Sequence, residues 1–132
     1  MNMSQSAVLF ALSFTGKDKE RWLENYWIKN KNAVARGTGN TSNAWVIPAE
    51  QTSKANAAEA VAGLQAQGVE VHKATAAFTE GGVNVKAGDW VIRGDQPYRT
   101  VVDMYFARQN YSMANPSPYD DLGWTYPMMR NL

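Results

Sequence analysis

AWVIPAEQTSKANAAEAVAGLQAQGVEVHKA, residues 44–74, is the stretch that decides the predicted fold. Its first four residues form a short apolar strand, and Pro48 ends the pairing because proline has no N–H to donate. An alanine-rich helix follows, with Ser53 as its N-cap and Gly68 just beyond its last turn. VEVHKA then alternates apolar and polar residues, as a strand does. Strand, helix and strand in this order predict a βαβ unit of a parallel sheet.

The chain after this unit continues the same alternation of strand and helix. DWVIR, residues 89–93, is predicted as a further strand, and residues 96–109 as the next helix, with Pro97 in its first turn. The helical period turns Val101 and Tyr105 toward the sheet. An alternation of strands and helices is typical of α/β proteins.

The chain before this unit is predicted to be helical. Residues 4–14 are apolar on nearly every side, as a short buried helix or a short buried strand would be, and the helix is preferred. Residues 15–37 form a long amphipathic helix, capped by Thr15 and ended by Gly37 and Gly39. Its apolar face, within residues 22–34, is rich in aromatic side chains, and we expect that face to contact another domain or subunit.

These elements predict an α/β fold with a small, mostly parallel sheet flanked by helices. Residues 1–36 are predicted as an N-terminal helical segment packing on the domain, and residues 37–132 as the α/β domain itself, in one structural unit. A chain of 132 residues that is 45% hydrophobic is long enough to bury a core.

Composition excludes several functions. The net charge of +1 does not suggest a nucleic-acid surface, which normally needs a clustered basic face, so no nucleic-acid partner is expected. There is no cysteine, which excludes thiolate nucleophiles and cysteine metal sites in this chain. The early run AVLFAL is too short to span a membrane and does not have the pattern of a signal peptide, so no membrane partner is expected.

The strand-to-helix junction at RGDQPY, residues 93–98, is the first candidate site, because ligands of open α/β sheets bind at the carboxyl ends of strands. A late segment rich in aromatic and acidic residues is the second. Helix capping by Asp95 and Asp120 is the favoured interpretation at both places, and a ligand role is the alternative. The residues predicted to contact a ligand or an interface are Arg93, Asp95, Gln96, Tyr98, Tyr119, Asp120 and Trp124.

His72 is the only histidine in the chain. A zinc site needs three or four converging ligands, and the sequence contains no His-x-x-Glu, no His-x-x-x-His and no cysteine pair. A solvent-facing or structurally bonded strand histidine is therefore favoured over a catalytic one. No catalytic residue, metal ligand or cofactor is predicted for this chain.

Three segments, taken in order, carry a family resemblance. They are NAWVIPAEQ with AAEAVAGLQAQGVEVHKATAAF, then AGDWVIRGDQPYRTVVDMYFARQNY, then PSPYDDLGWTYPMM. Together they resemble the region that follows the catalytic domain in large bacterial zinc carboxypeptidase-like proteins, the metallocarboxypeptidases of the carboxypeptidase A-like class. The likeness runs from about residue 17 to residue 130. The last segment departs from the family pattern at Asp121, Leu122, Gly123 and Tyr126.

The resemblance implies a class I glutamine amidotransferase-like, flavodoxin-like architecture. It also implies that zinc belongs to the parent's peptidase domain, because neither the family's zinc ligands nor its general base has a matching position in this chain. The implied parent is exported, to the periplasm or the medium. The amidotransferase-like nucleophile is a cysteine, which is absent here.

The leading functional expectation is a non-catalytic accessory domain of a zinc carboxypeptidase-like protein, supporting the peptidase domain or its assembly. Its partner would be the parent's peptidase domain or another subunit, and a homo-oligomer is compatible with this. The alternative is a stand-alone module that binds a small molecule or glycan through the loops around 93–98 and 116–124. A minimal hydrolase using Asp95, Asp120 or His72 is the third, and it requires those groups to converge.

Overall fold

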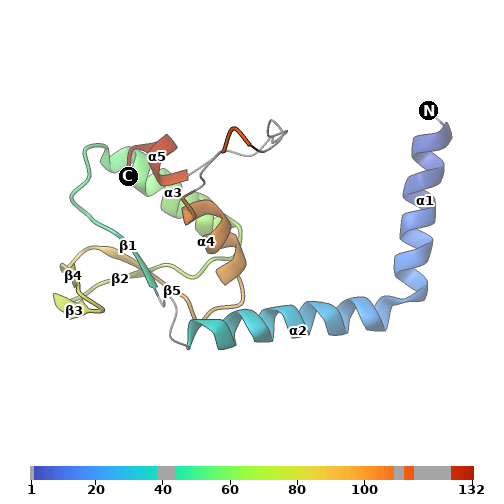
Figure 1. Ribbon diagram of the computed structural model, residues 1–132, viewed down its shortest axis with the longest axis horizontal. Helices are drawn as coiled ribbons and strands as arrows, with labels where there is room; N and C mark the ends of the chain where they lie inside the picture. The colour runs from blue at the N-terminus through green and yellow to red at the C-terminus, as the bar shows by residue number, and fades with distance from the viewer. Residues whose placement is uncertain (1, 39–43, 109–111, 115–125) are drawn as a thin grey trace.

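The computed structural model describes residues 2–38, 44–108, 112–114 and 126–132. Figure 1 shows two parts, a body and a helical arm that extends from one edge of it. The arm consists of α1 and α2, and the body (residues 44–132) holds the remaining elements. The elements in chain order are α1 (Asn2–Lys17), α2 (Lys19–Gly37), β1 (Ala44–Ile47), α3 (Lys54–Ala66), β2 (His72–Lys73), β3 (Phe78–Glu80), β4 (Val83–Val85), β5 (Trp90–Arg93), α4 (Arg99–Phe106) and α5 (Tyr126–Arg130).

The main sheet is antiparallel, so the prediction of a mostly parallel, flavodoxin-like or class I glutamine amidotransferase-like sheet is wrong. Its strand order is β1-β5-β2, and β5 pairs antiparallel with both neighbours. The strands β1 and β2 therefore run in the same direction, as the βαβ pattern predicted, but β5 lies between them. A second sheet is the antiparallel hairpin β3–β4, which turns at Gly81 and Gly82, both with positive φ.

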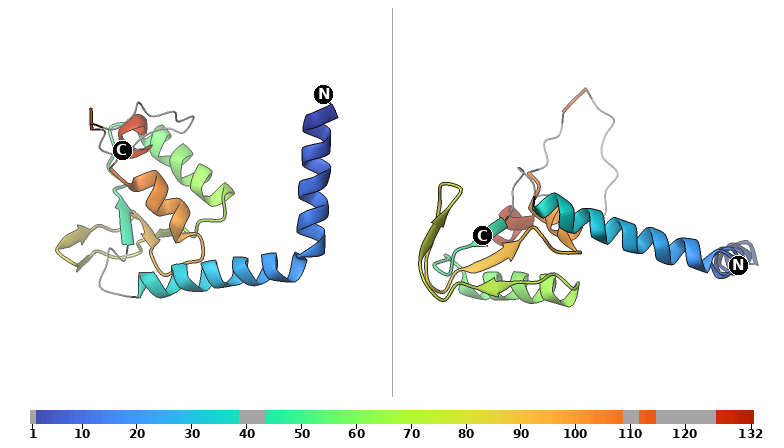
Figure 2. Two further views of the ribbon diagram at one scale, coloured as in Figure 1. Left: turned by 45° about the vertical axis from the view of Figure 1, so that its right-hand side comes forward. Right: turned by 90° about the horizontal axis from the view of Figure 1, so that it is seen from below.

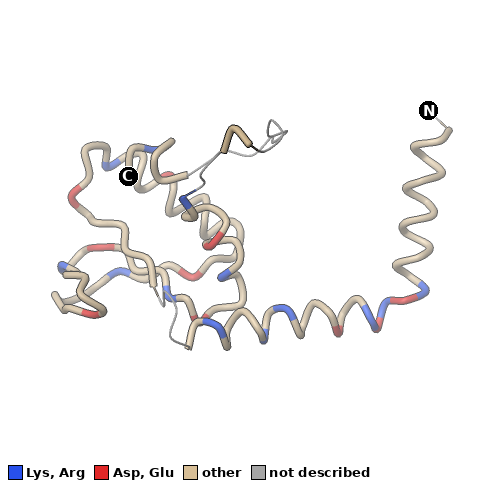
Figure 3. Tube along the Cα trace, viewed as in Figure 1, with Lys and Arg blue, Asp and Glu red and all other residues tan. Residues whose placement is uncertain are grey.

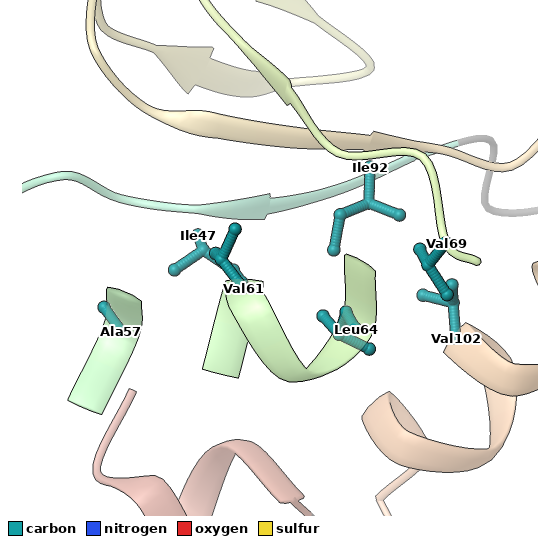
Figure 4. Packing of buried hydrophobic residues seen from close by; sticks show 7 residues of the cluster. All are labelled: Ile47, Ala57, Val61, Leu64, Val69, Ile92 and Val102. Carbon is teal, nitrogen blue, oxygen red and sulfur yellow. The ribbon is translucent and has the colours of Figure 1, made fainter. Parts of the chain in front are cut away.

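One face of the main sheet is buried. Trp45 pairs with Ile92 and Ile47 with Trp90, and cross-strand partners lie on the same face, so these four side chains face the core. Two helices, α3 and α4, cover that face, and Figure 4 shows the packing. The buried cluster comprises Ile47, Ala57, Val61, Leu64, Val69, Ile92 and Val102.

The signals predicted for α3 are confirmed. The Ser53 hydroxyl oxygen accepts a hydrogen bond from the Asn56 N–H at 3.3 Å, which caps the first turn. Gly68 follows the helix with φ of 85°, a conformation that favours glycine. Ala57 and Ala60 are fully buried, and Ala57 belongs to the buried cluster beneath the sheet.

The start of α4 differs from the prediction. The helix begins at Arg99, so Pro97 precedes it instead of standing in its first turn, and its N-cap position, Tyr98, makes no side-chain capping bond. Val102 is fully buried, while Val101 and Tyr105 are partly buried against the same core.

The two helices of the arm, α1 and α2, follow one another directly and meet at Asp18. The predicted cap at Thr15 is wrong, because the Thr15 hydroxyl donates to the Ala11 carbonyl at 2.9 Å inside α1. Ala33 and Gly37, near the end of α2, are the buried residues of the arm. Figures 1 and 2 show that α1 stands apart from the body, whereas the last turns of α2 lie against it. The division predicted at residues 36 and 37 stays a prediction.

Candidate functional site

The end of β5 and the loop that leads to α4, residues 93–98, hold four of the predicted site residues. The loop lies where the central strand ends, next to the C-terminus of α2. The contact with α2 is close: a Cβ added at Gly37 would lie 2.2 Å from the carbonyl carbon of Gly94. The loop is therefore a structural junction between the arm and the sheet.

Gln96 in this loop is 2% exposed, and its amide is bonded to the protein itself. Its side-chain oxygen accepts from the Glu70 N–H at 2.8 Å, and its NH₂ group donates to the carbonyls of Glu70 at 3.1 Å and Arg93 at 2.6 Å. These bonds join the loop to the segment that leads into β2. The amide satisfies buried backbone groups, which indicates a structural role.

Arg93 and Asp95 form a bidentate pair on the surface of the loop. The Arg93 Nε–H donates to Oδ1 of Asp95 at 2.9 Å, and Nη2 contacts Oδ2. The hydrogen bond from Arg93 lowers the pKa of Asp95 below its ordinary value, and the positive charge of Arg93 acts in the same direction. The pKa of Arg93 is raised by the same bond. Asp95 is therefore an ionised partner of Arg93 and a weak base, and it does not cap α4.

His72 lies on the outer face of the sheet. It pairs with Val91, whose neighbours along β5, Trp90 and Ile92, face the core, so His72 points away from the core. Its side chain is exposed. His72, Arg93 and Asp95 thus share an open surface, not a pocket in which an acid and a base converge.

Tyr98 connects three helices. Its hydroxyl lies 3.1 Å from the hydroxyl of Tyr26 in α2, and this hydrogen bond raises the pKa of Tyr98. Its ring packs over Gly68 after α3, where an added Cβ would lie 3.0 Å from the ring. Tyr98 therefore helps to set the position of the arm on the body.

A recess of about 580 Å³ lies between α2 and α4, beside this tyrosine pair. Its volume is within the usual range for small-ligand sites, about 300–1,000 Å³. The lining residues include two cations, five side chains with an amide or a hydroxyl group, and apolar groups. They are Tyr26, Lys29, Asn30, Asn32, Ala33, Arg36, Pro97, Tyr98, Thr100 and Val101. Arg36 is also paired with Asp103 of α4 at 3.7 Å.

The remaining predicted site residues, Tyr119, Asp120 and Trp124, lie outside the described residues. Within the described ranges, no group of three or more His, Cys, Asp and Glu side chains could hold a metal ion. These described residues therefore do not fit a zinc site.

The largest uncovered apolar surface belongs to the arm. All the described side chains of α1 are exposed, including Leu9 at 67% and Phe10 at 75%. In α2, Trp22, Leu23 and Trp27 are between 49% and 67% exposed. Figure 3 shows α1 without charged residues until its last turn. No helix among the described residues meets the length and hydrophobicity that a membrane span requires.

Comparison with known proteins found no matching family model, no matching curated protein and no matching solved structure. The resemblance to zinc carboxypeptidase-like proteins therefore stays a hypothesis.

Sequence reasoning missed two features of the structure. It expected residues 4–14 to be buried, whereas that segment is exposed in this chain. It also assigned no role to Asp89, which is 4% exposed and accepts hydrogen bonds from the N–H groups of Ala49 and Lys86. An acidic residue directly before an apolar strand, in a Gly-Asp turn, was the available signal for the second feature.

Proposed function

We propose that this chain is a non-catalytic accessory domain of a zinc carboxypeptidase-like protein and that its arm, α1 and α2, is the docking element. The observation that carries the proposal is the uncovered apolar surface of the arm, which includes Phe10, Trp22 and Trp27. Large exposed apolar patches are typical of protein interaction sites. The partner is the peptidase domain or another subunit of the same assembly.

The polar residues of the loop at 93–98 support a non-catalytic role. Arg93 and Asp95 neutralise one another, and Gln96 is bonded to backbone groups. A general base has to remain free to take a proton from the substrate at working pH, and the Arg93 pair opposes this for Asp95. The loop then contributes rigidity where the arm meets the body.

A binding experiment tests the docking role. The purified chain is mixed with a separately produced bacterial zinc carboxypeptidase-like catalytic domain, and the complex is followed by size-exclusion chromatography and calorimetry. We expect a complex with a Kd on the order of 10 μM or tighter. Phe10→Glu should abolish it, because a charge replaces an apolar side chain in the contact.

Phe78→Glu is the matched control for this experiment. Phe78 is also an exposed phenylalanine, at 47%, but it lies on the β3–β4 hairpin of the body. This variant should bind the catalytic domain as well as the unmodified chain does. Equal binding by Phe10→Glu would show that the arm is not the docking element.

The recess between α2 and α4 favours a second candidate function, a small-molecule or glycan binding module. Its tyrosine pair and the side chains of Asn30 and Asn32 offer stacking surface and hydrogen bonds suited to a sugar. Saturation-transfer NMR with a panel of mono- and disaccharides tests it. Signal that disappears in Tyr98→Ala, but not in Phe78→Ala, would support this function over pure docking.

A further inference from the structure

The corner between α1 and α2 departs from helical geometry at a single residue. Asp18 has φ of −109° and ψ of 25°, whereas a helical residue has about −63° and −42°. Helical hydrogen bonds continue on both sides of it. The Asp18 N–H donates to the Phe14 carbonyl at 3.2 Å, and the Trp22 N–H donates to the Asp18 carbonyl at 3.1 Å. The bend therefore depends on the two dihedral angles of one residue, with no intervening loop.

Few side-chain contacts among the described residues hold the corner in its bent arrangement. The rings of Phe14 and Trp22 meet edge to face, with 6.5 Å between their centroids. Arg21 and Asp18 form an ion pair at 3.6 Å, but their side chains are 75% and 45% exposed, so water screens the pair. A hollow of about 230 Å³ lies beside these residues, so their side chains do not fill the corner. One ring contact is therefore the main side-chain support of the bend.

Charges near the corner also favour two separate helices. Lys17 stands in the last turn of α1, and Glu20 stands in the first turn of α2, so each charge is complementary to the dipole of its helix. Asp18 occupies the N-cap position of α2 but makes no side-chain capping bond, so it contributes only its charge. Each such charge shifts the equilibrium toward the bend by about two- to five-fold.

A single continuous helix would instead form additional backbone hydrogen bonds. Where one helix ends and another begins, the last carbonyls of the first and the first N–H groups of the second lack intrahelical partners. An unbroken helix pairs the N–H groups of residues 19, 20 and 21 with the carbonyls of residues 15, 16 and 17. Residues 15–21 contain no proline, which would prevent this pairing. Each of these bonds contributes only modestly, because water bonds to the same groups in the bend.

The body does not fix the direction of α1. None of the described side chains of α1 is buried, and Figures 1 and 2 show that this helix stands apart from the body. The contacts of the arm with the body lie at the other end of α2, at Ala33 and Gly37. The corner at Asp18 can therefore open without breaking the core or the contact between α2 and the body.

We propose that Asp18 is a hinge with two arrangements of comparable free energy, the bend described above and one continuous helix from Asn2 to Gly37. The contributions that favour each arrangement are of the same small size, since each changes the populations by about two- to ten-fold. Opening the hinge carries the apolar residues of α1 away from the body along the axis of α2. A partner that binds only one arrangement then loses apparent affinity in proportion to the population of the other. The hinge is a property of the chain alone and goes beyond the docking function.

The distance between two spin labels measures the two populations. The chain has no cysteine, so Ser6→Cys in α1 and Ala35→Cys in α2, both at exposed positions, give one defined pair of labels. The 29 residues from position 6 to position 35 span about 44 Å in a continuous helix at 1.5 Å per residue, and less across the bend. Pulsed electron paramagnetic resonance should detect both a distance near 44 Å and a shorter one.

Substitutions at the corner should change the ratio of the two distances. Phe14→Ala should raise the ratio of the long to the short distance by about two- to ten-fold, because it removes a ring contact that only the bend makes. Phe10→Ala is the matched control, because it makes the same exchange one turn earlier in α1, at a side chain that is 75% exposed. It should leave the ratio unchanged. Asp18→Ala should also raise the ratio, because alanine favours a helix interior and removes a negative charge from the start of α2.

Each outcome decides between a hinge and a fixed arm. Two distances whose ratio responds to Phe14→Ala, but not to Phe10→Ala, support the hinge. A single short distance in every variant overturns it and leaves a rigid corner. A single distance near 44 Å in every variant overturns it as well, because the arm is then one straight helix. The docking function is tested separately, by binding to the catalytic domain.

Discussion

Gly37→Ala should separate the arm from the body, although alanine is normally the better helix residue. A Cβ at position 37 would lie 2.2 Å from the carbonyl carbon and oxygen of Gly94 and 2.3 Å from the Asp95 nitrogen. Carbon atoms in ordinary contact are about 3.5–4.0 Å apart. The end of α2 and the loop at residues 94–95 would have to move apart by more than about 1 Å. The loop atoms that the new Cβ meets belong to the backbone, so they cannot rotate away as a side chain could. The loop cannot yield easily, because Gln96 and the Arg93–Asp95 pair hold it.

Two effects of opposite sign set the magnitude. Exchanging glycine for alanine inside a helix gains up to about 1 kcal/mol, and less at a helix end. Forcing a methyl group into a filled contact costs about 1–3 kcal/mol. We therefore expect a net loss of about 1–2 kcal/mol in the free energy of unfolding. The chain can relax by lifting α2 away, which breaks the hydrogen bond between Tyr26 and Tyr98.

Urea unfolding at one fixed protein concentration measures the stability, and hydrogen exchange at residues 94–96 measures the contact. Gly63→Ala is the matched control, because its new Cβ would meet only the Tyr126 hydroxyl at 3.8 Å inside the helical α3. That variant should be neutral or more stable. Gly16→Ala meets nothing within 4 Å and should raise the helicity of α1. A Gly37→Ala protein as stable as Gly63→Ala, with unchanged exchange at 94–96, would refute the contact.

Three further predictions concern the body. Leu64→Ala should lower the free energy of unfolding by about 2–5 kcal/mol, because Leu64 is 1% exposed and the smaller side chain leaves a cavity. Urea unfolding measures this loss, and a value below about 1 kcal/mol would contradict the packing of Leu64. Gln96→Leu should cost about 1–3 kcal/mol by leaving the Glu70 N–H unpaired, and faster exchange of that amide is the direct readout. Asp89 accepts backbone bonds from Ala49 and Lys86 that lower its pKa below 3.8, so its stabilising effect is present above the unfolded value and is lost as pH falls through the lower folded value. Asp89→Asn should therefore flatten the acid side of the stability curve measured by urea unfolding between about pH 5 and pH 2, and an unchanged curve would count against this assignment.

Local signals in the sequence located several elements correctly. The strands AWVI and WVIR, the helix capped by Ser53 and the glycine at 68 all stand where they were expected. These signals work because a cap, a proline or a glycine acts within one turn of the backbone, whatever the rest of the chain does. The predicted helix cap at Thr15 was wrong, and the reason is also local. The Thr15 hydroxyl donates a hydrogen bond to the Ala11 carbonyl in the preceding turn of α1.

The candidate site was only partly readable from the sequence. The loop at 93–98 was found from its position after a strand, but its side chains bond to residues that no spacing rule could identify. Gln96 is bonded to Glu70, and Tyr98 is bonded to Tyr26. Each of these contacts depends on how distant segments pack together, so a motif alone could not separate a ligand site from a junction.

The sequence by itself determined where the helices and strands of the core lie and which of their faces are apolar, because both follow from local propensity and periodicity. The tertiary structure alone decided the strand order and direction. Strand alternation buries Trp90 and Ile92 equally well in a parallel or an antiparallel sheet, and only packing inserted β5 between β1 and β2. It also decided that α1 is exposed, since the apolar pattern of a helix shows that it needs a partner but not whether its own chain provides one.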